Sequence, residues 1–323
     1  FMLSAVLGLR APEQPGDPET IDPPVRGTVV HGALEAFFRE RRDEGRPGVG
    51  EAWQRADAVR LLELFEVQLA AARARGLGGL PVFARQQERA LRADLIAFLD
   101  ADSLFRRETG AVPMEFERRI DAVGPGGQRF MGYVDRIDRS HAGQVWVVDY
   151  KTGRPAEIDP ADPLGGGTRL QLPVYLLAAE GALEATAVYW YITARGGFQQ
   201  ARYTASAVAT EVFARTVAAI GAGVASGAFP PVPGAFDEHW SEFANCGRCD
   251  FTRVCPRARG DAYARKAGSD STAAWAAVAQ AAAGEEAIRE AATRPGMFQR
   301  MFPGKLSHSC LIKLRMTMFG EAV

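Results

Sequence analysis

Cysteine is scarce in this 323-residue chain, which contains only four. So few thiols cannot build the disulfide framework of a small secreted domain, and three of them cluster at Cys246, Cys249 and Cys255 in a spacing typical of metal ligands. Long apolar runs are lacking too, since no stretch of 18 uncharged apolar residues exists and the N-terminus has no signal-peptide layout. We therefore expect a cytoplasmic protein without a membrane partner.

An excess of charge of one sign is also absent. The formal net charge is -1, from 38 basic and 39 acidic residues, so a polyanionic partner would have to bind in a local basic groove. The chain has no G-x-x-x-x-G-K-[ST] element, which excludes ATP binding through a P-loop. The stretch "GGGTR" (165–169) lacks the lysine and is expected to be a loop.

The hydrophobic periodicity changes twice along the chain. Apolar residues at helical spacing predict helices near 26–45, 52–75 and 83–104, and period-2 patterns predict strands at 112–120, 129–139, 144–151, 185–193 and 199–205. Further helices are predicted at 170–181, 206–226 and 271–292. This order indicates an α/β fold with a mixed β-sheet flanked by helices. We expect a helical part at 1–110, a sheet core at 111–235, a cysteine segment at 236–268 and a helical tail of unknown role at 269–323.

Two aspartates interrupt the most apolar strand pair. Asp149 and Lys151 share one face of their strand, and a three-residue turn at "HAG" would place Asp135 directly opposite Asp149. Opposed carboxylates repel each other, so this register indicates a bound hard cation such as Mg²⁺ or Mn²⁺. The alternative is structural: Asp135 pairs with Arg136 or Arg139, while Asp149 and Lys151 form a salt bridge.

Three further residues are unremarkable one by one. His31 lies on an apolar helical stripe, where a histidine is usually a packed core residue, and Gln171 and Tyr175 share a helix face. Their order along the chain is more specific. The segments "GTVVHGALE", "GYVDRID", "VVDYKTG" and "QLPVY" together resemble the RecB-type branch of the PD-(D/E)XK nucleases, the nuclease domain of RecB, AddA, AddB and AdnA/AdnB-like helicase-nucleases.

The resemblance implies a restriction-endonuclease-like fold and a role for each matching residue. His31, Asp135, Asp149 and the main-chain carbonyl of Tyr150 would be metal ligands. Lys151 would orient or activate the attacking water, with support from Gln171 and Tyr175 of the Q-xxx-Y motif. These assignments imply that Lys151, Asp135, Asp149, Gln171 and Tyr175 are catalytic. Glu115 or Glu117 would match a further acid, and the sequence does not say which.

The implied activity is Mg²⁺- or Mn²⁺-dependent hydrolysis of DNA phosphodiesters, with exonuclease action on single-stranded ends. By the same resemblance, the chain would act in bacterial double-strand break repair and recombination, near the nucleoid. Its helicase motor would lie upstream in the same polypeptide or on a partner subunit. The alternatives are a stand-alone nuclease of the CRISPR-adaptation type and a catalytically inactive DNA-binding scaffold.

The cysteine spacing is C-x2-C-x5-C, for which zinc is the general expectation. In AddB-like relatives this pattern holds a [4Fe-4S] cluster, so the resemblance implies that Cys246, Cys249 and Cys255 bind one. The fourth ligand would then lie upstream of Phe1, in a longer polypeptide. Cys310 is the other candidate, in a stretch without a family match.

Overall fold

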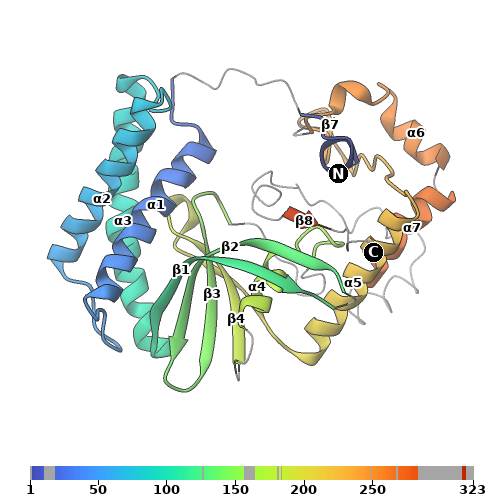
Figure 1. Ribbon diagram of the computed structural model, residues 1–323. Coiled ribbons are helices and arrows are strands. Elements are labelled where there is room, and N and C mark those ends of the chain that lie inside the picture. The colour runs from blue at the N-terminus through green and yellow to red at the C-terminus, as the bar shows by residue number, and fades with distance from the viewer. Residues whose placement is uncertain are drawn as a thin grey trace.

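A five-stranded mixed sheet between two helical layers forms the centre of the protein, as predicted. The computed structural model describes residues 2–10, 19–125, 127–155, 164–179, 182, 184–247, 249–266, 268–282 and 315–317. Figure 1 shows the sheet with one layer of helices on its left side and shorter helices on its other side. The predicted class, an α/β core flanked by helices, is therefore confirmed.

The strands follow the chain from one edge of the sheet to the other. They are β1 (Ala111–Val123), β2 (Arg129–Ser140), β3 (Gln144–Lys151), β4 (Glu184–Tyr191) and β5 (Gln200–Thr204), in the order β1-β2-β3-β4-β5. Neighbours are antiparallel except β3 and β4, which are parallel. A parallel pair requires a crossover connection, and the link from β3 to β4 carries helix α4 (Gln171–Leu176). A short strand, β8 (Arg315–Thr317), pairs with the start of β2.

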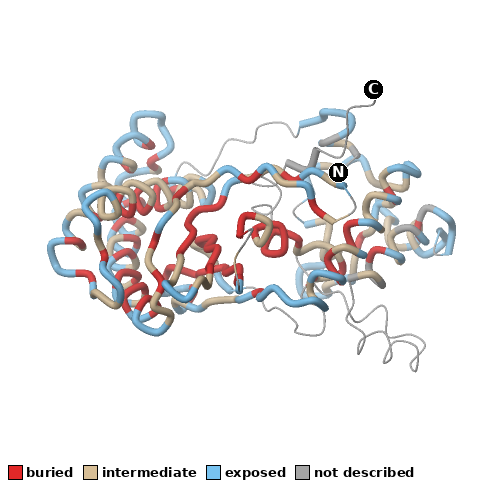
Figure 2. Tube along the Cα trace, turned by 60° about the horizontal axis from the view of Figure 1, so that its bottom comes forward, coloured by how far each residue is buried: buried red, intermediate tan, exposed pale blue. Residues whose placement is uncertain are grey.

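The helices divide between the two faces of the sheet. The first face is covered by α1 (Pro23–Asp43), α2 (Arg55–Ala74) and α3 (Pro81–Thr109), and the second by α4, a 3₁₀ turn (Leu177–Ala179) and α5 (Ala207–Ala225). Beyond them follow β6 (Phe236–Asp237), β7 (Glu242–Phe243), α6 (Arg259–Lys266) and α7 (Asp270–Ala282), of which α7 packs on α5. Short turns of helix occur at Met2–Val6, Ala194–Gly196 and Thr252–Val254. Buried residues line the inner sides of the helices and the central strands (Figure 2).

Local sequence explains where the main helices begin and end. Prolines in the first turn start α1 and α3, where the missing N–H has no helical partner to lose. Gly110 ends α3 in the left-handed conformation, at φ 65°. The Ser206 side chain caps α5 by accepting a hydrogen bond from the amide of Ala209. The helix expected near 271–292 is observed as α7 up to Ala282, and the rest of it lies outside the described residues.

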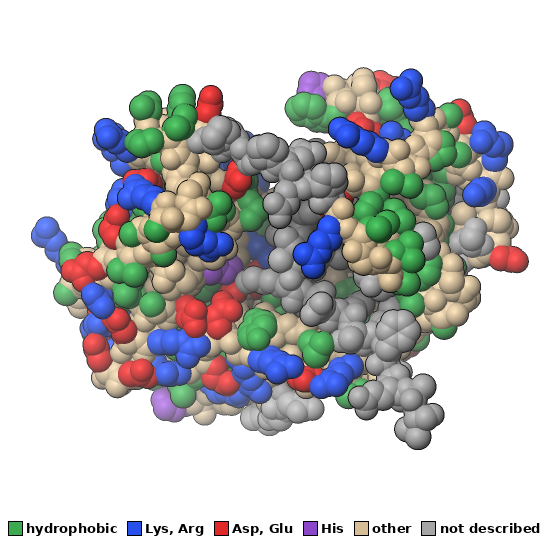
Figure 3. Space-filling view, turned by 45° about the horizontal axis from the view of Figure 1, so that its top comes forward, with side chains coloured by type: hydrophobic (Ala, Val, Ile, Leu, Met, Phe, Trp, Pro, Cys, Tyr) green, Lys and Arg blue, Asp and Glu red, His purple; other side chains and the backbone are tan. Residues whose placement is uncertain are grey.

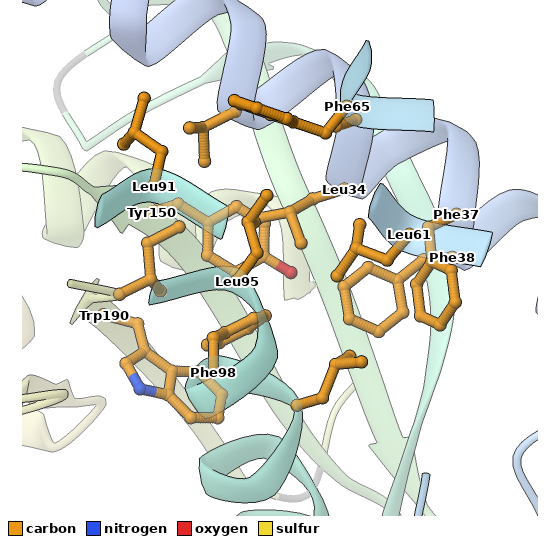
Figure 4. Packing of buried hydrophobic residues seen from close by; sticks show 14 of the residues in the cluster. Leu34, Phe37, Phe38, Leu61, Phe65, Leu91, Leu95, Phe98, Tyr150 and Trp190 are labelled. Atoms are coloured by element: carbon orange, nitrogen blue, oxygen red, sulfur yellow. The ribbon is translucent and has the colours of Figure 1, made fainter. Parts of the chain in front are cut away.

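The apolar stripe of α1 makes the first hydrophobic core. Its residues Val30, Ala33, Leu34, Phe37 and Phe38 are all buried, as the helical spacing predicted. Figure 4 shows three of them packed in one cluster with residues of α2, α3 and the sheet; the three are Leu34, Phe37 and Phe38. The same layer that completes the core therefore fixes α1, and with it His31, against the sheet.

Helix α5 is the one helix in the described part of the chain that is long and apolar enough to cross a membrane. It carries Glu211 and Arg215, and its residues Val212, Phe213 and Val217 pack into the second core against the sheet. Core helices of globular proteins pass the same test of length and composition.

Two arginines are fully buried between the first helical layer and the sheet. Arg136 of β2 donates to Asp102 Oδ1 at 2.6 Å, to Asp138 Oδ1 at 2.5 Å and to the Tyr150 hydroxyl at 3.3 Å. Arg106 donates to Asp102 Oδ2 at 2.8 Å. Burial acts to raise the pKa of Asp102, but the two guanidinium groups outweigh it and hold that pKa below its usual value. Asp102 therefore stays charged and compensates both arginines.

Removal of Asp102 tests this compensation. We expect Asp102→Ala to lower the free energy of unfolding by about 3–5 kcal/mol, because two buried cations would lose their shared carboxylate. Urea denaturation monitored by circular dichroism measures the difference. The control is Asp121→Ala, which breaks the exposed pair with Arg129 and should cost about 0–1 kcal/mol. Equal losses in the two variants would show that burial does not set the cost.

Candidate active site

The hairpin of β2 and β3 has the register predicted from the sequence. Its backbone pairs run from Arg136 opposite Val148 to Arg139 opposite Val145. The turn is closed by the amide of Gly143, which lies at φ 83° and donates to the Ser140 carbonyl at 3.1 Å. Continued by one position, this register places Asp135 opposite Asp149.

The same row of the sheet extends to both sides of the two aspartates. On β1, the pairs Phe116–Arg136 and Arg118–Val134 flank Glu117, which therefore lies opposite Asp135. On β4, Tyr189 lies beside Asp149 in the parallel register. Glu117, Asp135, Asp149 and Tyr189 thus form one row across four strands.

The strand pair β1–β2 bends at this row. Phe116 packs in the core under α1–α3, whereas Ile120, also even-numbered, packs in the core under α4 and α5. Regular alternation would keep both on one face. Between them Glu117 has φ 45°, a left-handed conformation that is uncommon for a side-chain-bearing residue. We attribute the exchange of faces to this residue and to the twist it introduces.

His31 joins helix α1 to the bend. Its Nδ1 lies 3.2 Å from Asp135 Oδ1, while the other carboxylate oxygen, Oδ2, accepts a hydrogen bond from the Tyr150 amide at 2.8 Å. The His31 ring also packs edge-on against the Tyr150 ring, with centroids 5.8 Å apart. Asp135 is 3% exposed, so these contacts orient a carboxylate that is almost fully buried.

Three ligand-bearing side chains meet at the bend. Atoms of His31, Glu117 and Asp135 all lie within 4.8 Å of one another, the one such group in the part of the chain that the structure describes. One imidazole and two carboxylates suit a divalent cation such as Mg²⁺ or Mn²⁺. The group also selects Glu117 over Glu115, because Glu115 forms ion pairs with Arg118 and Arg139 instead.

Asp149 and Lys151 lie beside this group in a polar network of their own. Asp149 Oδ1 accepts hydrogen bonds from Gln171 Nε2 and from the Tyr175 hydroxyl, both at 3.0 Å. Asp149 Oδ2 is buried and contacts the Lys151 ammonium, but it accepts no hydrogen bond of good geometry. Lys151 Nζ donates to Gln171 Oε1 at 3.2 Å and lies 4.6 Å from the centre of the Tyr189 ring.

Tyr175 acts as a hydrogen-bond donor in this network. Burial, followed by the charge of Asp149, raises the pKa of its phenol well above 10, so the hydroxyl keeps its proton at neutral pH. Gln171 is 1% exposed and contacts both Asp149 and Lys151, which fixes the amide between carboxylate and ammonium. The Q-xxx-Y pair thus orients the two residues that share one face of β3.

The structure distinguishes between the two readings of the hairpin. Arg136 pairs with Asp102 and Asp138, and Arg139 pairs with Glu115, so the alternative partners proposed for Asp135 are wrong. The contact between Lys151 and Asp149 that this alternative also proposed is present. Asp149 does not belong to the 4.8 Å group, and the carbonyl of Tyr150 remains a predicted ligand only.

Sequence patterns did not identify Tyr189 as a site residue. It is 9% exposed, and it reaches Lys151 because β4 lies parallel to β3. The register of these strands depends on a connection that contains α4, and no local motif reports it. The sequence pattern also could not decide between Glu115 and Glu117, because the bend that turns Glu117 toward His31 interrupts the period-2 alternation of the strand.

The cysteine segment winds through consecutive tight turns. The amide of Cys249 donates to the Cys246 carbonyl at 3.0 Å, and that of Cys255 donates to the Thr252 carbonyl at 3.4 Å. Burial raises the pKa of the Cys246 thiol, while a hydrogen bond from Arg259 acts in the opposite direction. Within the described residues the three sulfur atoms do not form a group within 4.8 Å of one another. Cys310 lies outside the described residues.

A glycine at position 117 separates backbone strain from metal binding. We expect Glu117→Gly to leave the melting temperature unchanged or raise it, because glycine adopts φ 45° without the cost of about 1–2 kcal/mol that a Cβ imposes there. Affinity for Mn²⁺ should fall by about tenfold or more, since one carboxylate ligand is lost. Differential scanning fluorimetry without metal and calorimetric titration with Mn²⁺ measure the two effects.

The matched control is Glu115→Gln on the same strand. It removes a carboxylate that is already paired with arginines, so Mn²⁺ affinity should stay within about twofold of the parent protein. A Glu117→Gly protein that binds Mn²⁺ as tightly as the parent would exclude Glu117 as a ligand.

Comparison with known proteins agrees with this geometry. A family model described as "PD-(D/E)XK nuclease superfamily" matches residues 1–256. No curated protein matches the chain. One similar solved structure, titled "Crystal structure of SSO0001", is 17% identical and covers 69% of this chain and 95% of its own; its TM-score of 0.28 is too low to support any argument. The family match covers most of the chain, including the bend and the whole candidate site, and on that ground this protein belongs to the PD-(D/E)XK nuclease superfamily.

Proposed function

We propose that this chain is a Mg²⁺-dependent deoxyribonuclease of the RecB type. The observation that carries the proposal is the meeting of His31, Glu117 and Asp135 at the bend, directly beside a lysine held by Gln171 and Asp149. Metal-dependent hydrolysis of a phosphodiester requires a set of metal ligands next to an oriented positive charge, and this site supplies both.

Each residue has a defined task in this proposal. His31, Glu117 and Asp135 would hold the divalent cation, with Asp149 and the Tyr150 carbonyl as further ligands, and the bound cation would supply charge neutralisation and a more acidic water. Lys151 would place its ammonium against the scissile phosphate and stabilise the charge that develops there. Gln171 and Tyr175 orient Asp149 through hydrogen bonds, and Gln171 also orients Lys151.

The direct test is hydrolysis of end-labelled linear DNA with Mg²⁺. We expect Asp135→Ala and Lys151→Ala each to lower the rate by about a hundredfold or more, because each removes charge stabilisation from the reacting phosphate. Circular single strands, assayed in parallel, distinguish attack at ends from internal cutting.

Two exposed residues of the same types are the controls. Asp43→Ala and Lys266→Ala change side chains at the ends of α1 and α6, and both should cleave at the parent rate. If Asp135→Ala or Lys151→Ala still degraded DNA with Mg²⁺ at the parent rate, the assignment would be refuted.

We propose further that the domain serves a helicase-nuclease in bacterial double-strand break repair, acting as an exonuclease on single-stranded ends. The order of the four motifs supports this context. The motor would lie upstream of Phe1 or on a partner subunit, and the location would be the cytoplasm. A stand-alone nuclease of the CRISPR-adaptation type is the second candidate, favoured by the same motifs and cysteine spacing. A scaffold without activity is disfavoured by the retention of His31, Asp135, Asp149 and Lys151.

We also propose that Cys246, Cys249 and Cys255 ligate a [4Fe-4S] cluster whose fourth cysteine lies upstream of Phe1. The C-x2-C-x5-C spacing supports the proposal. The cluster would have a structural role. Anaerobic purification of a longer chain that includes the upstream segment, followed by iron, sulfide and zinc analysis, tests this assignment, and one zinc per chain without iron would contradict it.

A further inference from the structure

Beyond the bend, the outer face of β1 and β2 carries an exposed arginine and an exposed tyrosine side by side. We propose that Tyr133 stacks on a base of the substrate strand and that Arg119 binds the adjacent phosphate, so that the two hold a single DNA strand next to the metal group. This inference rests on the proposed nuclease function and names residues that hold its substrate.

Backbone register places the pair next to the site. Arg119 lies opposite Tyr133, two residues along each strand from the acids Glu117 and Asp135. Two residues of a β-strand span about 7 Å. A DNA strand bound to Tyr133 and Arg119 would therefore reach the candidate metal ligands within about one nucleotide.

The surface formed by Tyr133 and Arg119, called the platform below, is supported by packing on the opposite side of the two strands. Ile120, Phe130 and Val134 point to the opposite face of the same two strands and are buried in the second core, where the Phe130 ring lies 6.0 Å from that of Phe213. Packing on one side leaves the other side outward: Tyr133 is 51% exposed and the Arg119 side chain 62% exposed. An aromatic ring that is fixed at its backbone and open on its face suits stacking, because little order has to be gained on binding.

Charge on this face favours a polyanion although the whole chain is nearly neutral. Beyond the bend, Arg119 and Arg129 share this face with one carboxylate, Asp121. Asp121 is engaged by Arg129 through two hydrogen bonds, of 2.6 and 2.7 Å, and contacts Arg119 only at 3.5 Å. Figure 3 shows several Lys and Arg side chains along the lower part of this view, interspersed with acidic ones.

The chemistry selects a single strand as the occupant. A tyrosine ring can stack only on a base face that is free, and duplex DNA buries those faces between neighbouring base pairs. Arg119 supplies a phosphate contact that is independent of sequence. We therefore infer that this pair gives the enzyme its preference for single strands without base specificity.

A mutant cycle between protein and DNA tests the stacking. Tyr133→Ala should raise KM for a single-stranded oligonucleotide at least fivefold and leave kcat within twofold, whereas Tyr133→Phe and Tyr133→Trp, which keep a ring, should behave as the parent. An abasic site is then moved along the oligonucleotide. When the abasic site occupies the position that contacts Tyr133, KM of the parent enzyme should rise by the same factor as in Tyr133→Ala. KM of the Tyr133→Ala variant should not rise further.

Arg119→Ala has a different expected signature. Its binding should weaken equally for all sequences, and the slope of log K against log[salt] should fall by about 0.7, the value for one phosphate contact on a single strand. The matched controls are Arg85→Ala on α3 and Trp240→Ala beside β7, both exposed and neither on this face. Both should leave KM and the salt slope unchanged.

Fluorescence anisotropy of the same oligonucleotides in EDTA separates this inference from the proposed function. A protein that binds strands through Tyr133 but hydrolyses none with Mg²⁺ would refute the nuclease assignment and keep the platform. A protein that hydrolyses DNA, but whose Tyr133→Ala variant has unchanged KM and unchanged anisotropy, would overturn the platform alone. The stacking contact would also be overturned if the increases in KM caused by the abasic site and by Tyr133→Ala were independent, so that their product gave the increase for the two changes together.

Discussion

The repulsion among three carboxylates in one row of the sheet is the constraint on which the site depends. Glu117, Asp135 and Asp149 occupy neighbouring strands at the same level, an arrangement that is unfavourable unless each charge is compensated. The protein compensates them separately. His31 and the Tyr150 amide hold Asp135, and Gln171, Tyr175 and Lys151 surround Asp149. Glu117 adds a further negative charge beside Asp135, which a divalent cation bound there would neutralise.

Tyr150 connects this site to the hydrophobic core. Its amide binds Asp135, its ring packs against His31 and Phe98, and its hydroxyl accepts from the buried Arg136. The buried arginine cluster under the first helical layer therefore helps to fix the backbone that holds Asp135 and the ring against which His31 packs. Charge burial serves positional accuracy here, since a loosely held Tyr150 would move both Asp135 and His31.

The bend at Glu117 divides β1 and β2 into two parts that pack in different hydrophobic cores. On one side of the bend, β1 and β2 contribute to the first hydrophobic core under α1–α3, and β2 carries the buried Arg136. On the other side the same strands turn their apolar face to α4 and α5, and their polar face becomes an open surface. A single residue in the left-handed region thus places a carboxylate beside His31 and Asp135, at the row where both strands exchange faces.

Periodicity and spacing along the chain determine much of this protein's architecture. The "HAG" turn specified the register of β2 and β3, because a three-residue loop leaves one way to pair the flanking strands, and the order of His31, Asp135, Asp149, Lys151, Gln171 and Tyr175 specified the superfamily. Tertiary structure decided the rest. Glu117 was selected over Glu115 by a left-handed backbone that no propensity predicts, and Tyr189 reached Lys151 through a parallel pairing. The compensation of Arg136 by Asp102 joins residues 34 positions apart, and only the packing of α3 on the sheet brings them together.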